Sequence, residues 1–285
     1  MVSSANSRSV ALITGGTSGL GLEAARGLIQ QDVQVLLVGR NENAGATVLE
    51  RLRNEKSDAQ VAFLRADLAI QAQVRDLAQK VRSTVDRLDM LIHGAGIVLP
   101  TRRETSEGIE QTLAVNFLAP RILTEELLPL LKASAPSRII GVTTLVEPLG
   151  GLRLNDLQRT RNYAPLATYA GTKRVLVLWA RDLARQLAGS GVTVNLFDPY
   201  VMRTPFATAP DAPLLFKIAN PFLLNPRRAG RGLVRVATDS TLRDVTGARF
   251  LLGNRFPHLP GTGSSELARQ LRQASDQLIV GVSAM

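Results

Sequence analysis

The sequence has no cysteine and only two histidines, and each shortage excludes a class of site. Without cysteine there are no disulfide bonds, thiolate nucleophiles or zinc–sulfur centres. His93 and His258 alone cannot form a histidine-rich metal site. No uninterrupted apolar run approaches the roughly 20 residues of a membrane-spanning helix. Residues Met1 to Ser9 contain no apolar signal-peptide core. We therefore expect a cytoplasmic protein without a transmembrane span.

Acidic residues are also scarce, and the formal net charge of +10 raises the question of nucleic-acid binding. The basic residues are nearly all arginines, and they are scattered over the whole chain. The tightest cluster is Arg227, Arg228 and Arg231. Nucleic-acid binders concentrate charge on one face and interleave aromatic residues, which make up only 4% here. We expect no nucleic-acid partner, and the local positive charge favours an anionic cofactor.

Strand-length apolar runs alternate with amphipathic helical patterns along the 285 residues. The expected strands are Ser9–Thr14, Val33–Gly39, Gln60–Ala66, Met90–His93, Arg138–Thr143, Val192–Phe197 and Ala248–Leu251. The expected helices include Leu20–Gln31, Ala69–Val85, Glu107–Lys132 and Ala167–Ala188. The apolar runs are nearly continuous, which is typical of strands buried on both faces. The pattern predicts an α/β fold with a doubly wound parallel sheet (Rossmann fold), in a single domain over residues 1–285.

Two segments interrupt this alternation. Leu145–Leu166 is a long connection between a strand and a helix, and Pro199–Pro226 contains six prolines. We expect a lid over about residues 200–226, followed later by a C-terminal helical tail over about residues 264–281. The lid is rich in large apolar side chains, which must be buried against the core, a ligand, a partner subunit or a membrane surface. A bulky apolar substrate explains this composition, and packing against the core is the alternative.

A glycine-rich turn follows the first expected strand and precedes a helical pattern. Its sequence is Thr14-Gly15-Gly16-Thr17-Ser18-Gly19-Leu20-Gly21. Glycines let the backbone turn tightly, and the helix N-terminus presents free amides to an anion. In this position the turn predicts a site for the pyrophosphate of a dinucleotide. The residues expected to contact the cofactor here are Gly15, Thr17, Ser18, Gly19, Leu20 and Gly21.

Two polar residues after the next strands bear on the choice of cofactor. Arg40 stands where an acidic residue would bind the ribose of NAD, and arginine instead suits the 2′-phosphate of NADP. We therefore expect NADP (NADPH), with a chance surface arginine as the alternative. Asp67 ends the third strand and could accept a hydrogen bond from adenine, or it could cap a helix.

Tyr169 and Lys173 lie four residues apart near the start of an expected helix, so both share one face. We expect the adjacent ammonium to favour the phenolate and lower the pKa of the tyrosine. Such a tyrosine can exchange a proton with an alcohol or a carbonyl oxygen. Tyr163 has no such partner, because Ala167 follows it at the same spacing.

Taken in order, these motifs resemble the short-chain dehydrogenase/reductase family, and the retinol-dehydrogenase-like branch most of all. The resemblance covers about residues 8–255. It rests on the glycine turn, Asp67-Leu68, His93-Gly94-Ala95-Gly96, Val115-Asn116-Phe117, the Tyr169/Lys173 pair and the run from Pro199 to Thr204. The branch is suggested by Leu113–Lys132, Leu183–Gly191 and the long gap before Tyr169.

The resemblance implies a role for each matching residue. Tyr169 would be the acid/base, Lys173 would hold the nicotinamide ribose, and Asn116 would anchor a proton-relay water. Thr144 takes the place of the serine that orients the substrate carbonyl. Further cofactor contacts would come from Asp67, Leu68, Gly94, Ala95, Gly96, Pro199, Met202 and Thr204.

Several residues depart from the family pattern around one pocket. Thr144 replaces serine, His93 and Gly94 replace two asparagines, and Tyr200 replaces a glycine. His93 ends a buried strand, so we expect a core histidine rather than a catalytic one. The leading hypothesis is an NADP(H)-dependent oxidoreductase that interconverts a ketone or aldehyde and an alcohol. The alternative is a cofactor-binding protein of the same fold with a non-redox role, such as a cyclase, an isomerase or a regulatory protein. The sequence is also compatible with a homo-oligomer, either a dimer or a tetramer.

Overall fold

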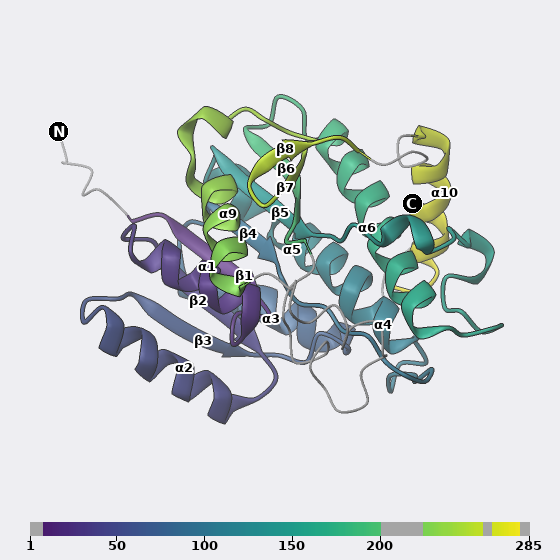
Figure 1. Cartoon of the computed structure of the whole chain (residues 1–285), viewed down its shortest axis with the longest axis horizontal. Coiled ribbons are helices and arrows are strands. Elements are labelled where there is room, and N and C mark those ends of the chain that lie inside the picture. The colour runs from purple at the N-terminus through teal and green to yellow at the C-terminus, as the bar shows by residue number, and fades with distance from the viewer. Residues whose placement is uncertain (1–7, 201–224, 259–263, 280–285) are drawn as a thin grey trace.

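The computed structural model describes residues 8–200, 225–258 and 264–279. Their centre is an eight-stranded sheet in the order β3-β2-β1-β4-β5-β6-β7-β8 (Figure 1). The strands are β1 Val10–Thr14, β2 Gln34–Gly39, β3 Val61–Arg65, β4 Met90–His93, β5 Ser137–Val142, β6 Val192–Asp198, β7 Arg249–Leu251 and β8 Asn254–Phe256. The first seven strands are parallel and β8 pairs antiparallel with β7. This is the doubly wound parallel sheet that the sequence predicts.

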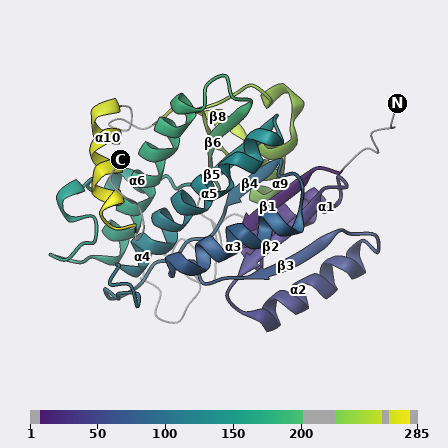
Figure 2. The same ribbon diagram turned by 180° about the vertical axis from the view of Figure 1, so that it is seen from behind.

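Helices cover both faces of the sheet. They are α1 Gly19–Ile29, α2 Glu42–Glu55, α3 Gln71–Thr84, α4 Gln111–Leu113, α5 Ala119–Ala133, α6 Pro165–Gln186, α9 Pro226–Thr238 and α10 Ser265–Asp276. One face carries α1 and α9, and the view from behind shows α3, α5 and α6 on the other (Figure 2). Both faces of the central strands are therefore buried, which explains their nearly continuous apolar sequence.

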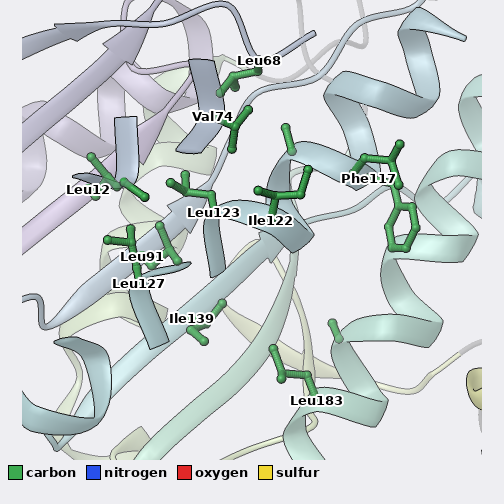
Figure 3. Packing of buried hydrophobic residues seen from close by; sticks show 14 of the residues in the cluster. Leu12, Leu68, Val74, Leu91, Phe117, Ile122, Leu123, Leu127, Ile139 and Leu183 are labelled. Carbon is green, nitrogen blue, oxygen red and sulfur yellow. The ribbon is translucent and has the colours of Figure 1, made fainter. Parts of the chain in front are cut away.

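Alternate residues of the strands supply two separate hydrophobic cores. Leu12, Leu91 and Ile139 point to one face, where Leu123 and Leu127 of α5 pack on them (Figure 3). Their chain neighbours point to the other face and pack on α1 and α9. The two-residue period of a strand thus divides one apolar run between two layers of helices.

The seven expected strands agree with the structure to within one residue at each end. The expectation of one helix over Glu107–Lys132 is wrong. The segment begins as α4 and continues as a π-helix, η1 Ala114–Leu118, before α5 starts at Ala119. β8 was not expected, because a three-residue edge strand carries too little periodicity to be recognised.

The C-terminal helix α10 packs against α5 and α6, within the expected helical tail. Leu271 is buried in the shared core. Arg121 of α5 forms an ion pair with Asp276, and Arg272 pairs with Asp182 of α6 at 2.6 Å. The expected lid lies almost wholly outside the described residues, since only Tyr200, Asn225 and Pro226 of that range are described. No helix in the described part of the chain is long and apolar enough to cross a membrane.

Candidate active site

The residues expected to act together gather at the carboxyl edge of the sheet. The glycine turn follows β1, Arg40 follows β2, and the segment from Gly94 to Gly96 follows β4. Thr144 lies just beyond β5, and Tyr169 and Lys173 come from the second and third turns of α6. Because parallel strands end at a common edge, segments far apart in sequence meet here, and this edge is where ligands bind in open α/β sheets.

The glycines of the turn are required by close contacts of the backbone. Gly15 has φ +69°, and a Cβ there would lie 2.9 Å from the backbone of Ala95. A Cβ on Gly21 would lie 2.3 Å from the carbonyl oxygen of Gly15. The amides of Gly15 and Gly16 both donate to the carbonyl of Val38, at 3.1 and 3.4 Å. The turn is thereby folded against the ends of β2 and β4.

The N-terminus of α1 is suited to hold an anion. Ser18 is the N-cap but its side chain caps no amide, and no acidic residue lies in the first turn. At Gly19, which has φ +52°, an added Cβ would meet no described atom within 4 Å. The positive dipole end of the helix therefore has no acidic side chain or side-chain cap, and Gly19 leaves space beside it. These residues fit the pyrophosphate of a dinucleotide.

Arg40 is exposed immediately after β2. Gly39, the residue before Arg40, lies against Thr17 of the glycine turn, since a Cβ on Gly39 would come within 3.1 Å of the Thr17 methyl. Arg40 therefore stands beside the turn. Asp67 accepts a hydrogen bond from the amide of Ala69 at 3.0 Å, in the connection leading to α3. The alternative role as a helix cap is wrong, because the N-cap residue of α3 is Ile70 and this bond precedes the helix. Leu68 is buried in the core, which leaves its backbone as the group that could contact a cofactor.

The segment after β4 is held close to β1. A Cβ on Gly94 would lie 2.7 Å from the carbonyl oxygen of Thr14, and the amide of Ala95 donates to the Thr14 hydroxyl at 3.3 Å. His93 is buried, and its Nε2 lies 2.8 Å from the hydroxyl of Thr124. Burial, together with the charge of Lys173, lowers the pKa of His93 to about 3. His93 is the neutral core histidine that the sequence predicts.

Asn116 lies within the π-helix η1 and connects two parts of the site. Its Oδ1 accepts from the amide of Ile97 at 2.8 Å, and its Nδ2 donates to the carbonyl of Ile97 at 3.0 Å. The same Nδ2 donates to the hydroxyl of Thr172 at 3.1 Å. A single π-turn often marks a functional position in a helix. Here it presents an asparagine that ties the segment after β4 to α6.

Lys173 is buried one helical turn after Tyr169. Its Nζ donates to the carbonyl of Val142 at 2.8 Å and lies 5.9 Å from the centre of the Tyr169 ring. Burial lowers the pKa of Lys173 to about 8, although the charge of Asp198 opposes this shift. A Cβ on Gly96 would lie 3.4 Å from this Nζ and 3.5 Å from Oδ1 of Asn116. The glycine leaves room beside both polar groups.

The expectation of a lowered pKa for Tyr169 is wrong. Desolvation raises the pKa of Tyr169 to about 12, and the charge of Asp198 adds to this rise. A hydrogen bond with the side chain of Thr144 acts in the opposite direction. The threonine therefore places a hydroxyl beside the phenol of Tyr169. Tyr163 makes a different contact, since its hydroxyl donates to the carbonyl of Leu99 at 2.9 Å.

Tyr200 keeps the backbone conformation expected of the glycine that it replaces. Its φ is +63°, and its amide donates to Oδ1 of Asp198 at 2.9 Å. The side chain is 45% exposed and follows the buried Pro199. The ring therefore lies at the surface beside the carboxyl edge of the sheet. Met202 and Thr204, the remaining expected cofactor contacts, lie outside the described residues.

Three buried charged residues behind the site were not expected from the sequence. They are Glu147, Asp198 and Arg249, all with 0% relative exposure. The one signal was an arginine inside the short apolar run Ala248–Leu251. Its partners Asp198 and Glu147 lie about 50 and 100 positions earlier in the chain, so no local sequence pattern predicts that the three residues meet.

Comparison with known proteins agrees with this geometry. The family model described as "short chain dehydrogenase" matches residues 9–213, which is more than half of the chain. The chain is 31% identical to human retinol dehydrogenase 13 over 280 residues, covering 94% of this chain and 83% of that protein. It is 34% identical to mouse polyprenol dehydrogenase over 274 residues, covering 92% and 81%.

Solved structures share the fold. A protein from Mycobacterium paratuberculosis superposes with a TM-score of 0.73 at 24% identity, covering 96% of both chains. The NADP complex of RhlG from Pseudomonas aeruginosa has a TM-score of 0.68 at 25% identity, covering 85% of this chain and 94% of that one. This chain belongs to the short-chain dehydrogenase family, in the retinol-dehydrogenase-like branch. It is an NAD(P)-dependent oxidoreductase that acts on an alcohol or carbonyl group.

Proposed function

We propose that this protein uses NADP(H) to interconvert a ketone or aldehyde and an alcohol on a bulky apolar substrate. The observation that carries the proposal is the meeting of Thr144, Tyr169 and Lys173 at the sheet edge where the glycine turn ends β1. A proton donor, a hydroxyl that contacts it and a buried ammonium therefore adjoin a site suited to a dinucleotide.

Each side chain has a distinct task in the proposed reaction. With a pKa of about 12, the phenol of Tyr169 holds its proton at neutral pH and can give it to the substrate oxygen. Thr144 orients that phenol through its hydroxyl. Lys173 supplies a positive charge that stabilises the phenolate left behind. When bound, the cofactor would supply hydride chemistry, toward the carbonyl carbon in reduction and from the alcohol carbon in oxidation.

Four further observations support the finer points of the proposal. Arg40 is exposed beside the glycine turn, where its planar guanidinium can pair with a 2′-phosphate. The exposed ring of Tyr200 can stack on an apolar ligand at the sheet edge. The names of the relatives, retinol dehydrogenase and polyprenol dehydrogenase, also point to apolar alcohols. The apolar composition of the segment after Tyr200 agrees with this choice.

The non-redox alternative rested on Thr144, His93, Gly94 and Tyr200. The hydroxyl of Thr144 contacts Tyr169, and His93 packs in the core without occupying the site. The backbone at Tyr200 has the positive φ of the glycine it replaces. These departures are therefore compatible with carbonyl reduction, and they do not favour a second function.

The test of the chemistry is Tyr169→Phe, which removes the transferable proton and keeps the ring. We expect turnover to fall by roughly 10²-fold or more, with NADPH binding nearly unchanged. Tyr163→Phe is the matched control and should retain its activity, because its hydroxyl bonds to the Leu99 carbonyl and the Thr112 side chain. Substrates should be a graded panel of carbonyl compounds of rising size and hydrophobicity, followed by NADPH consumption. Full activity in Tyr169→Phe would refute the chemistry, and best turnover on a small charged compound would refute the substrate class.

The cofactor choice has its own test. NADPH should bind at least about tenfold more tightly than NADH, which corresponds to about 1.4 kcal/mol, and Arg40→Ala should remove the preference. Arg51→Ala, at an exposed arginine of α2, is the control and should leave it intact. Equal affinities of the unaltered protein for the two cofactors would refute the assignment.

Three broader expectations accompany the proposal. The single sheet with one core on each face supports one domain over residues 1–285. A cytoplasmic location is to be tested by cell fractionation, and a dimer or tetramer by sedimentation at several protein concentrations.

A further inference from the structure

Three fully buried charged side chains lie directly behind Thr144. Arg249 of β7 donates from Nη2 to Asp198 at 2.7 Å and from Nη1 to Glu147 at 3.0 Å. Asp198 ends β6, and Glu147 begins the short helix η2 Glu147–Leu149 after β5. Burying charges is costly unless each is paired. Packing alone therefore does not explain why three charged side chains are buried beside the candidate active site.

The guanidinium of Arg249 also holds the backbone of the hydroxyl residue. Its Nη2 donates to the carbonyl oxygen of Thr144 at 3.0 Å. The amide of Glu147 donates to the same oxygen at 3.3 Å, and the hydroxyl of Thr143 donates to the Glu147 carboxylate at 3.3 Å. The planar fork of arginine can make such bonds in fixed directions, which a lysine cannot. The peptide of Thr144 is thus fixed from behind, while its hydroxyl contacts Tyr169.

Asp198 also acts on the buried lysine. The charged and titratable groups facing Lys173 are Asp198 from β6, Tyr169 from its own helix and the neutral His93 from β4. The carbonyl of Val142 accepts its hydrogen bond, Val142 pairs with Phe197 of β6 in the sheet, and Asp198 is the next residue after Phe197. Asp198 is the one negative charge in this set. With Arg249 and Glu147, the buried groups comprise two cations and two anions, so the cluster is neutral when Lys173 is protonated.

We infer that Arg249 is a positioning residue for Thr144 and that Asp198, its buried partner, is the counter-charge that keeps Lys173 protonated. The positioning role of Arg249 rests on the proposed function, because it assumes that Thr144 takes part in turnover. The counter-charge can be tested without turnover. The two parts predict different outcomes for two variants.

The counter-charge is tested by Asp198→Asn, which keeps the shape and removes the charge. The chain has five lysines, so ¹³Cε-lysine labelling gives few NMR signals, and Lys173→Met identifies the one from Lys173. In the unaltered protein this signal should titrate near pH 8. In Asp198→Asn the midpoint should fall by about one unit. Glu147→Gln is the matched control: it removes another buried partner of Arg249 that has no contact with Lys173, and it should shift the midpoint much less. Equal shifts in the two variants, or none in Asp198→Asn, would overturn this part.

The positioning role is tested by Arg249→Lys, which keeps the charge and loses the fork. We expect kcat to fall at least fivefold, with NADPH affinity and the Lys173 midpoint nearly unchanged. In a Thr144→Ala background the same substitution should cost less than twofold, because the group that it positions is gone. Equal losses in both backgrounds would overturn the role. If Arg249→Lys does not fold, the double variant Arg249→Met, Glu147→Gln, which removes one buried ion pair and leaves Asp198 for Lys173, is compared in the two backgrounds by the same criterion.

The outcomes also separate this inference from the proposed function. A protein that reduces no carbonyl compound, but whose Lys173 midpoint falls in Asp198→Asn, refutes the proposed function and leaves the counter-charge in place. An active protein with equal losses from Arg249→Lys in both backgrounds supports the proposed function and refutes the positioning role.

Discussion

Gly19, at the start of α1, offers the most direct test of where the cofactor phosphates bind. It has φ +52°, and an added Cβ would point into space that no described atom occupies within 4 Å. Asparagine tolerates this left-handed backbone better than other side chains do. Gly19→Asn should therefore fold normally while filling that space. Its amide oxygen would also compete for the free amides of the helix N-terminus.

The magnitude follows from the bonds at stake. A hydrogen bond from an amide to a charged group contributes about 1.5–3 kcal/mol. Losing one such bond to a phosphate should weaken NADPH binding by about 10- to 100-fold. The stability of the protein should change by less than about 1 kcal/mol, because the side chain meets no neighbour.

A matched control lies at the opposite edge of the sheet. Gly189, in the loop before β6, has φ +77° and likewise has no described atom within 4 Å of an added Cβ. Gly189→Asn makes the same chemical change in the same kind of backbone, and it should leave NADPH affinity unaltered. The assay is quenching or enhancement of nicotinamide fluorescence, with thermal unfolding followed in parallel. Equal affinities for the two variants would refute the assignment of the α1 N-terminus as the phosphate site.

Three further predictions concern stability and the hydroxyl at the site. Because the pKa of His93 is about 3 when folded and 6.5 when unfolded, protons bind the unfolded chain first, and stability is lost as pH falls from about 6.5 toward 3. By pH 4.5 the loss in the free energy of unfolding amounts to about 3 kcal/mol. In His93→Asn this loss should be smaller, as measured by urea unfolding at pH 7 and pH 4.5. An identical loss in both proteins would contradict the argument. Thr144→Ser should retain turnover and Thr144→Ala should lose most of it, whereas equal rates would show that the hydroxyl is idle. Tyr200→Gly should raise stability by about 0.5–1 kcal/mol by relieving its positive φ, and a fall in Tm would show that the ring contributes more by packing.

The features that could be predicted from sequence are those whose parts are close together in the chain. The strands were recognisable because their apolar runs are buried on both faces. The glycine turn and the Tyr169/Lys173 pair each span a few residues, so one turn of backbone settles their geometry. The core position of His93 also followed from its place at the end of a buried strand.

Other features depended on contacts between distant segments. The pKa of Tyr169 moved opposite to expectation, because desolvation and the charge of Asp198 outweigh the hydrogen bond with Thr144. The π-turn that carries Asn116 interrupts a segment whose amphipathic pattern reads as one continuous helix. The left-handed backbone of Tyr200 is supported by a carboxylate two residues earlier, a bond that the tyrosine itself does not signal.

The sequence by itself determined the parallel sheet, the glycine turn after β1 and the placing of Tyr169 and Lys173 on one helix face, because hydrophobic periodicity and short-range spacing act within single elements. Only the tertiary structure decided the charge state of that pair and the fixing of Thr144. Electrostatic effects on a buried group depend on what surrounds it in space. Here Asp198, Arg249 and Glu147 come together from three separate segments to supply those surroundings.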